Sequence, residues 1–200
     1  MLQDEADEAL MAKYQGGEVR AFEILMTRHR RPIYNFILRY VGNAPIAEEL
    51  LQETFLRVVR SASRYQPKAK FTTWLYTIAR NLCTDQARRA VHRRTRSLDA
   101  NFGAGDDSGT LLDVLPNDQI GADRESASTE IRKKLEDALS RLAEDQREVF
   151  LMREFHGMPF KEIASVVGAS ENTVKSRMRY ALEKLRIELA EFKELSKETF

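Results

Sequence analysis

Aromatic and hydroxyl side chains gather in the segment FTTWLYTIARN, residues 71–81. Phe71, Trp74 and Tyr76 fall within six positions, and on one helix these three rings cannot all face the same core. A ring left outside a core offers a flat surface on which an unpaired base can stack, with a gain of about 1 to 3 kcal/mol per base. Asn81 carries the donor and acceptor groups that could read a base held out of the stack. The segment therefore predicts a surface for single-stranded nucleic acid.

A basic tract follows this segment and could hold a phosphate backbone through Arg88, Arg89, Arg93 and Arg94. The net charge of +1 conceals it: from residue 64 to 96 nine of ten charged residues are basic, whereas from 99 to 130 eight of nine are acidic. Each part has a plainer alternative, because a basic face can simply be solvated. Core packing is the favoured role of Trp74 taken alone, and a polar contact within the fold competes for Asn81. The inference of a nucleic-acid surface therefore rests on the aromatic segment, Asn81 and the basic tract occurring together.

Residues 160–186 have the pattern of a helix-turn-helix. Residues 160–167 predict a short helix, Gly168 a tight turn, and Ser170 the N-cap of a second helix beginning at Glu171. The predicted buried stripe of that second helix consists of Val174, Met178, Ala181, Leu182 and Leu185. Its outward face carries Asn172, Ser176, Arg179 and Tyr180, with Lys175 and Arg177 on the flanks. These side chains can reach base edges and phosphates in a major groove, although a helical hairpin with a basic, solvated face is the alternative.

Apolar residues recur at helical spacing along most of the chain, which predicts an all-α fold. Early helices separated by Gly16-Gly17 are outlined by Leu10, Tyr14, Phe22, Leu25 and Met26, and the pattern continues through Ile33 to a stop at Gly42-Asn43. A helix over about residues 45–63 places one stripe inside, made of Ala47, Leu50, Leu51, Thr54, Phe55 and Val58. A loop around Pro67 precedes a helix that begins near Trp74 and runs into Arg88-Arg89.

The helical periodicity fails between about residues 97 and 127, where glycine, aspartate and asparagine accumulate. This composition indicates a flexible acidic linker, since so long a loop inside one domain would be unusual. Helices resume through Ile131, Leu135, Leu139 and Leu142. We therefore expect two helical domains, residues 1–96 and 128–200, joined by a linker of residues 97–127.

Other classes of protein find little support in the sequence. Cys83 is the only cysteine, so neither an intramolecular disulfide nor a Cys/His zinc site is expected. A hydrolytic enzyme is disfavoured because His29, His92 and His156 lie in no recognisable catalytic motif and there is no P-loop. We expect no catalytic residue, metal or cofactor. The acidic opening and the lack of a long apolar run predict a cytoplasmic protein that is neither exported nor inserted in a membrane.

These residues resemble a known family, the group IV or extracytoplasmic-function (ECF) sigma factors of the sigma-70 family. AEELLQETFLRVVRS, residues 47–61, looks like region 2.2 of that family, and FTTWLYTIARNLCTDQARR, residues 71–89, looks like regions 2.3 to 2.4. The helix-turn-helix looks like region 4.2. The resemblance covers about residues 21–89 and 139–186 in the family's order. Two helix starts depart from the pattern, with Ala143 where proline is common and Pro159 where a serine or threonine cap is usual.

The resemblance implies a non-enzymatic initiation factor that binds core RNA polymerase and promoter DNA. The polymerase β′ coiled coil would be bound by Glu49, Gln52, Glu53 and Arg57. The −10 element would be recognised and melted by Lys70, Phe71, Thr72, Thr73, Trp74, Tyr76, Asn81, Arg88 and Arg89, with a flipped base captured near Lys70 to Thr73. The −35 element would be read by Asn172, Thr173, Lys175, Ser176, Arg177, Arg179 and Tyr180, in a domain that also contacts the β flap.

Regulation and two rival functions complete the expectations from sequence. The resemblance implies an anti-sigma factor that clamps both domains, a role in a stress or envelope response, and a linker threaded towards the RNA exit path. The acidity of the linker is compatible with nucleic-acid mimicry. The main rival is a helix-turn-helix regulator that binds duplex DNA alone, with the first half as a sensor or dimerisation domain. A gel shift with and without core polymerase separates the two, and turnover of nucleotide or nucleic acid would revive a hydrolase.

Overall fold

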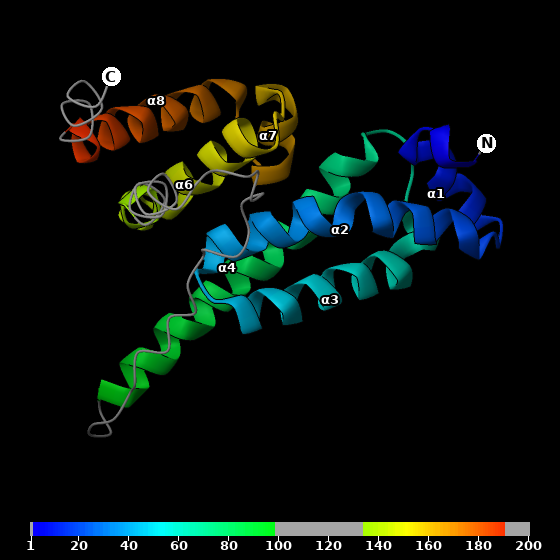
Figure 1. The fold of residues 1–200 in the computed structure, drawn as a ribbon, viewed down its shortest axis with the longest axis horizontal. Coiled ribbons are helices and arrows are strands. Elements are labelled where there is room, and N and C mark those ends of the chain that lie inside the picture. Colours follow the sequence, from blue (N-terminus) through cyan, green and yellow to red (C-terminus); the bar gives the residue numbers. More distant parts are fainter. Residues whose placement is uncertain (1, 99–133, 191–200) are drawn as a thin grey trace, which may run out of the picture. The chain divides into compact units, whose positions relative to one another are not determined.

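The computed structural model of the 200-residue chain describes residues 2–98 and 134–190, and the side chains of residues 91–98 are not considered. Every regular element in these two ranges is helical, which agrees with the predicted all-α class. The chain divides into two compact units: the first contains helices α1 to α4, and the second contains α6, α8 and the greater part of α7 (Figure 1). No helix in the described ranges is both long enough and apolar enough to cross a membrane.

The first unit has four main helices joined by short connections. Helix α1 (Asp7–Gln15) is followed by the predicted break at Gly16-Gly17, and α2 (Val19–Val41) ends at Gly42, whose φ of 69° lies in the left-handed region that favours glycine. The Asn43 side chain then caps α3 (Ala44–Ser61) by accepting the N–H of Ile46 at 3.0 Å. Local capping chemistry therefore fixes both ends of this turn.

The core of the first unit lies between α2, α3 and α4 (Phe71–Leu98), and α2 and α3 run side by side in Figure 1. All six residues of the stripe predicted on α3 are buried, including Thr54, whose hydroxyl donates to the Leu50 carbonyl at 2.7 Å. Helix α4 packs against α1, α2 and α3, and it is therefore buried on more than one side. It begins at Phe71, three residues before the predicted start near Trp74, after a 3-10 turn (Ala62–Arg64) and a loop.

In the second unit residues 134–140 are helical and precede α6 (Glu144–Phe150), a π-helical turn (Leu151–Phe155), α7 (Phe160–Val167) and α8 (Glu171–Glu188). The predicted helix-turn-helix is confirmed. Gly168 ends α7 with a φ of 68°, and the Ser170 hydroxyl accepts the N–H of Thr173 at 3.1 Å to cap α8. Neither Ala143 nor Pro159 supplies a side-chain cap, and both helices nevertheless begin directly after them.

One residue of the predicted stripe on α8 was assigned wrongly. Val174, Met178, Ala181 and Leu185 are buried, whereas Leu182 is 48% exposed. Leu182 follows Ala181 by one position and so points about 100° away from it around the helix. The predicted linker of residues 97–127 falls almost entirely outside the described residues, as does Ile131.

Candidate nucleic-acid interface

The exposed face of α8 carries most of the residues predicted to read duplex DNA. Asn172, Thr173, Ser176, Arg179 and Tyr180 are exposed, and so is Lys175. The Arg179 guanidinium lies 5.0 Å from the centre of the Tyr180 ring, which is 50% exposed. Lys175 pairs with Glu171 at 2.7 Å, but surface pairs of this kind contribute little, so the ammonium group can exchange its partner for a phosphate.

Arg177 has a different environment from the other predicted contacts on α8. Its Nε atom lies 3.0 Å from an Asp145 carboxylate oxygen, and its Nη1 atom lies 3.8 Å from an oxygen of Glu148, which is only 1% exposed. Arg177 follows Val174 by three positions and therefore flanks the buried stripe, next to α6. The Arg177 side chain therefore joins α8 to α6, and its expected contact with DNA stays a prediction.

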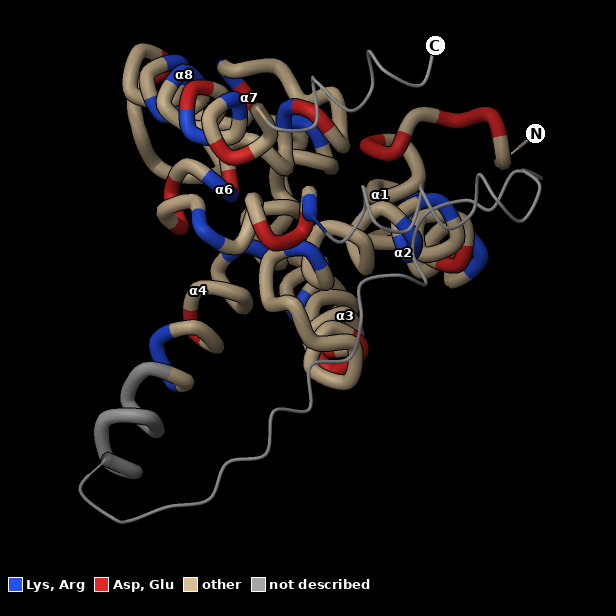
Figure 2. Tube along the Cα trace, turned by 60° about the vertical axis from the view of Figure 1, so that its left-hand side comes forward, with Lys and Arg blue, Asp and Glu red and all other residues tan. Residues whose placement is uncertain are grey.

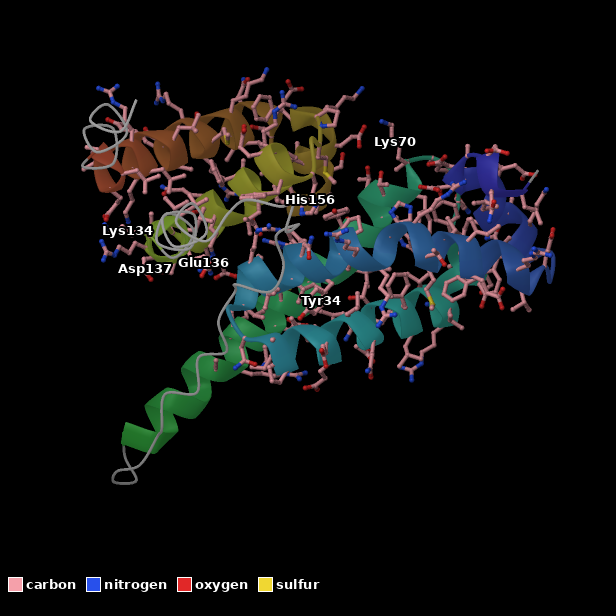
Figure 3. All side chains as sticks on the ribbon, viewed as in Figure 1. Tyr34, Lys70, Lys134, Glu136, Asp137 and His156 are labelled. Atoms are coloured by element: carbon pink, nitrogen blue, oxygen red, sulfur yellow. The ribbon has the colours of Figure 1, made fainter. Side chains whose placement is uncertain are left out.

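The exposed polar residues at and after the start of α4 form the second candidate surface. Lys70 directly precedes the helix and is exposed (Figure 3), while Thr72 is half-buried. Asn81 is exposed, which argues against the alternative that its amide serves a contact inside the fold. Arg88 is seven positions, or about two turns, further on and shares the face of Asn81. Arg89 is exposed as well, and Figure 2 marks the basic positions along α4.

Two of the three aromatic residues expected near a base are core residues. Phe71 is fully buried, with its ring 5.5 Å from that of His29 and 6.1 Å from that of Tyr65. Tyr76 is 4% exposed and meets Phe36 edge to face at 5.3 Å; burial raises the pKa of its hydroxyl. Both rings face packed neighbours because α4 is surrounded by three other helices. This burial argues against direct contact of either ring with a base.

Trp74 remains as the aromatic residue of this segment that reaches the surface. It is half-buried, with its ring 4.9 Å from that of Tyr65 and 6.0 Å from that of Phe71. Thr73 is buried as well, which argues in the same way against direct contact of its side chain with DNA. The predicted −10 residues at α4 whose side chains reach the surface are Lys70, Thr72, Trp74, Asn81, Arg88 and Arg89.

All four residues predicted to bind polymerase line one groove between α3 and α4. Glu49, Gln52, Glu53 and Arg57 border this groove of about 340 Å³, and Arg89 borders it from α4. Arg57 donates from Nε to a Glu53 carboxylate oxygen at 2.9 Å. The family resemblance alone had suggested this set, and the structure places all four side chains at one groove, while their contact with polymerase stays a prediction. Acidic positions on α3 are visible in Figure 2.

A larger groove of about 800 Å³ lies on the other side of α3, against α2. Arg30, Arg31 and Tyr34 border it from α2, and Tyr34 is labelled in Figure 3. Gln52 borders both grooves. The outward ridge of α3 therefore stands between two concave surfaces.

Sequence analysis missed the apolar part of this ridge. Leu56 is 47% exposed and borders the smaller groove, and Val59 is 41% exposed. The available signal was their position: both are apolar residues of α3 that fall outside its buried stripe. An exposed leucine between acidic and amide side chains suits a protein interface, where apolar contact supplies affinity and the polar rim supplies specificity.

Comparisons with known proteins match each of the two units to a family. The family described as Sigma-70 region 2 matches residues 25–94, and the family described as Sigma-70, region 4 matches residues 132–185. The RNA polymerase sigma factor CarQ of Myxococcus xanthus is 35% identical over 181 residues, which cover 90% of this chain and 96% of that protein. The ECF RNA polymerase sigma-E factor of Haemophilus influenzae is 30% identical over 188 residues, covering 92% of this chain and 95% of that one.

A solved structure shows the same fold. The sigma factor RpoE in complex with the anti-sigma factor NepR from Bartonella quintana superposes with a TM-score of 0.67 at 21% identity, covering 84% of this chain and 96% of that one. Because both family models match in the expected order and the relative CarQ is 35% identical over most of both chains, the chain belongs to the sigma-70 family of RNA polymerase sigma factors. Within the family it is a group IV, or ECF, sigma factor, which directs promoter-specific initiation of transcription.

Proposed function

We propose that the two units of this sigma factor divide promoter recognition between them. The first unit binds the β′ coiled coil of core RNA polymerase through Glu49, Gln52, Glu53 and Arg57 and opens the −10 element. The single observation that carries this proposal is the exposure of Asn81 and Arg88 on one face of α4, in the same unit as the groove that holds all four α3 residues. One rigid unit can then couple polymerase binding to capture of a base.

The second unit reads the −35 element and also contacts the β flap. The exposed donors on α8 support this role: Asn172, Thr173, Lys175, Ser176, Arg179 and Tyr180. A side chain that makes a bidentate contact with a base contributes about 1 to 3 kcal/mol of discrimination in a major groove. Arg177 holds α8 against α6 through its ion pairs with Asp145 and Glu148.

Opening of the promoter DNA depends on favourable contacts with the −10 element that offset the free-energy cost of unstacking its bases. Extruding a base costs a few kcal/mol, and a pocket that accepts only the extruded base offsets this cost when the sequence is right. Lys70, Thr72 and Trp74 supply such a surface at the start of α4, within three positions of the buried Phe71 ring, and Asn81 adds a polar group about 15 Å further along the helix. Because two promoter contacts are joined in one chain, tight binding comes from multivalency on the polymerase.

The remaining proposals concern context. The protein catalyses no reaction itself, uses no cofactor, acts in the cytoplasm and serves a stress or envelope response. Its domains are residues 1–96 and 128–200, with residues 97–127 as a linker. We also propose an anti-sigma factor as a partner, because the solved relative from Bartonella quintana is in complex with one. Pulldown from cells that returned polymerase and never a small second protein would contradict this last point.

The deciding experiment is transcription in vitro with core polymerase on a promoter library, with and without the protein. We expect start sites that depend on the protein and share −35 and −10 elements. A gel shift on a selected promoter should require both the protein and core polymerase. Binding to duplex DNA without polymerase, together with unchanged start sites, would instead favour the helix-turn-helix regulator.

A further inference from the structure

Helix α1 precedes the residues that the region 2 family matches, which begin at residue 25. It nevertheless packs against α2, α4 and the 3-10 turn Ala62–Arg64. Its side chains reach both ends of the connection between α3 and α4. That connection leads directly into Lys70 to Thr73, the segment proposed above to meet an extruded base.

The downstream end of the connection is capped from α1. A carboxylate oxygen of Glu8 accepts the backbone N–H of Phe71 at 2.7 Å, across 63 positions of sequence. Phe71 is the first residue of α4, and the first N–H groups of a helix have no acceptor within it. A negative charge at this end also complements the helix dipole. Glu8 thereby fixes where α4 begins.

The upstream end is held by the same helix. The Gln15 side-chain amide donates to the carbonyl oxygens of Ala62 at 2.8 Å and of Tyr65 at 2.9 Å. Glu8 and Gln15 lie seven positions apart, roughly 10 Å along α1. One rigid helix therefore sets the distance between the two ends of the connection.

Helix α1 is itself anchored on α2. The Asp7 carboxylate accepts hydrogen bonds from Arg28 Nη1 and His29 Nε2, each at 2.7 Å. The His29 ring then lies 5.5 Å from the ring of Phe71. The side chain and the backbone of Phe71 are thus both fixed by α1 and its anchor.

We propose that Glu8 and Gln15 are positioning residues for the capture of the −10 base, acting through the place at which they hold Lys70 to Thr73. The inference rests on the proposed function of that segment. A binding surface that is ordered before it meets DNA loses less conformational entropy on binding. A substitution that makes Lys70 to Thr73 more mobile should therefore weaken base capture, even though the substituted residue does not contact DNA. The α3 residues proposed to bind polymerase lie outside this connection, so we expect their binding to be unaffected.

The test uses holoenzyme assembled from the full chain and core polymerase. A labelled single-stranded oligonucleotide carries the non-template −10 sequence selected in the transcription experiment. Glu8→Ala and Gln15→Ala should each weaken oligonucleotide binding about fivefold, the factor expected for losing about 1 kcal/mol of capping. Their affinity for core polymerase should stay unchanged. Glu8→Gln keeps a neutral acceptor and should restore most of the binding.

Lys13→Ala is the matched control, since Lys13 lies on the same helix but pairs with Glu5 at 2.5 Å, away from the connection. The proposal is overturned if Glu8→Ala and Gln15→Ala behave like Lys13→Ala while Asn81→Ala weakens oligonucleotide binding; the proposed function then survives. Equal losses of oligonucleotide and polymerase affinity would also overturn it, because they indicate a general folding role. If Asn81→Ala itself has no effect, base capture by this unit fails, and the inference fails with it.

Discussion

Arg177 on the reading helix lies 3.0 Å from the Asp145 carboxylate on α6. The same guanidinium approaches Glu148, which is almost completely buried. The basic side chains of α8 therefore differ in their surroundings. Lys175 and Arg179 are exposed and available to DNA, whereas Arg177 holds the helix against α6. This difference predicts that stability and promoter choice in the second unit depend on different side chains.

We expect Arg177→Ala to lower the free energy of unfolding by about 2 kcal/mol, because it removes ion pairs from two carboxylates and one of these is buried. Arg179→Ala should change it by less than about 0.5 kcal/mol, since Arg179 is exposed. Urea unfolding measures the first effect. In transcription on a promoter library, Arg179→Ala should alter the preferred −35 sequence. The idea fails if Arg177→Ala shifts promoter choice at full stability.

Asn81→Ala and Asn172→Ala form a matched pair, as both replace an exposed asparagine on a helix surface. Asn81→Ala should reduce promoter opening about tenfold by loss of a contact of about 1 to 3 kcal/mol, and it should leave recruitment to duplex DNA nearly intact. Asn172→Ala should weaken selection of the −35 element and leave opening of a bound promoter unchanged. Fluorescence of a base analogue at the −10 element reports opening, and a gel shift reports recruitment. Equal effects of the two variants on opening would count against the proposed division.

Leu56 borders the groove between α3 and α4 and is 47% exposed, so Leu56→Asp should leave folding intact and place a charge in the proposed polymerase interface. We expect affinity for core polymerase to fall at least about tenfold. Val19→Asp is the control, because Val19 is 63% exposed on α2 and is not among the residues that border either groove. Titration of labelled protein with core polymerase gives both affinities. Similar losses for both variants would remove the groove from the proposed interface.

The ionised Asp7 carboxylate should stabilise the first unit, and this contribution should be lost at low pH. Burial acts to raise the pKa of Asp7, but the hydrogen bonds and charges of His29 and Arg28 outweigh it and hold the pKa below the ordinary value of 3.8. A lowered folded-state pKa contributes stability that is complete well above 3.8 and is lost as the pH falls through the lowered value. The stability advantage over Asp7→Asn should therefore be present in full at about pH 5 and shrink below about pH 4.

Urea unfolding at a series of pH values checks this expectation. Glu23→Gln, at an exposed position of α2, supplies the control for loss of one surface carboxylate. A gap between the natural protein and Asp7→Asn that stays constant down to pH values well below 3.8 would contradict a role for the ionised carboxylate.

Sequence patterns alone were enough to predict most of the helices, the buried stripe of α3 and the helix-turn-helix. These features depend on local rules, because helical periodicity and capping residues act within a few positions. Gly42, Asn43, Gly168 and Ser170 mark turns that the structure contains at those residues. The outward face that carries Arg179 was assigned in this way, whereas the sequence left open whether Asn81 is exposed.

The packing of distant segments determines which side chains remain exposed for contact with DNA or polymerase, and this could not be predicted from the sequence. Phe71 and Tyr76 are buried because three helices surround α4, and no spacing within residues 71–81 reveals that. Arg177 meets carboxylates of α6, and Glu8 caps a helix that begins 63 positions later. Contacts between distant segments are set by how elements pack, so the role of a side chain on a helix depends on the partner that its face meets.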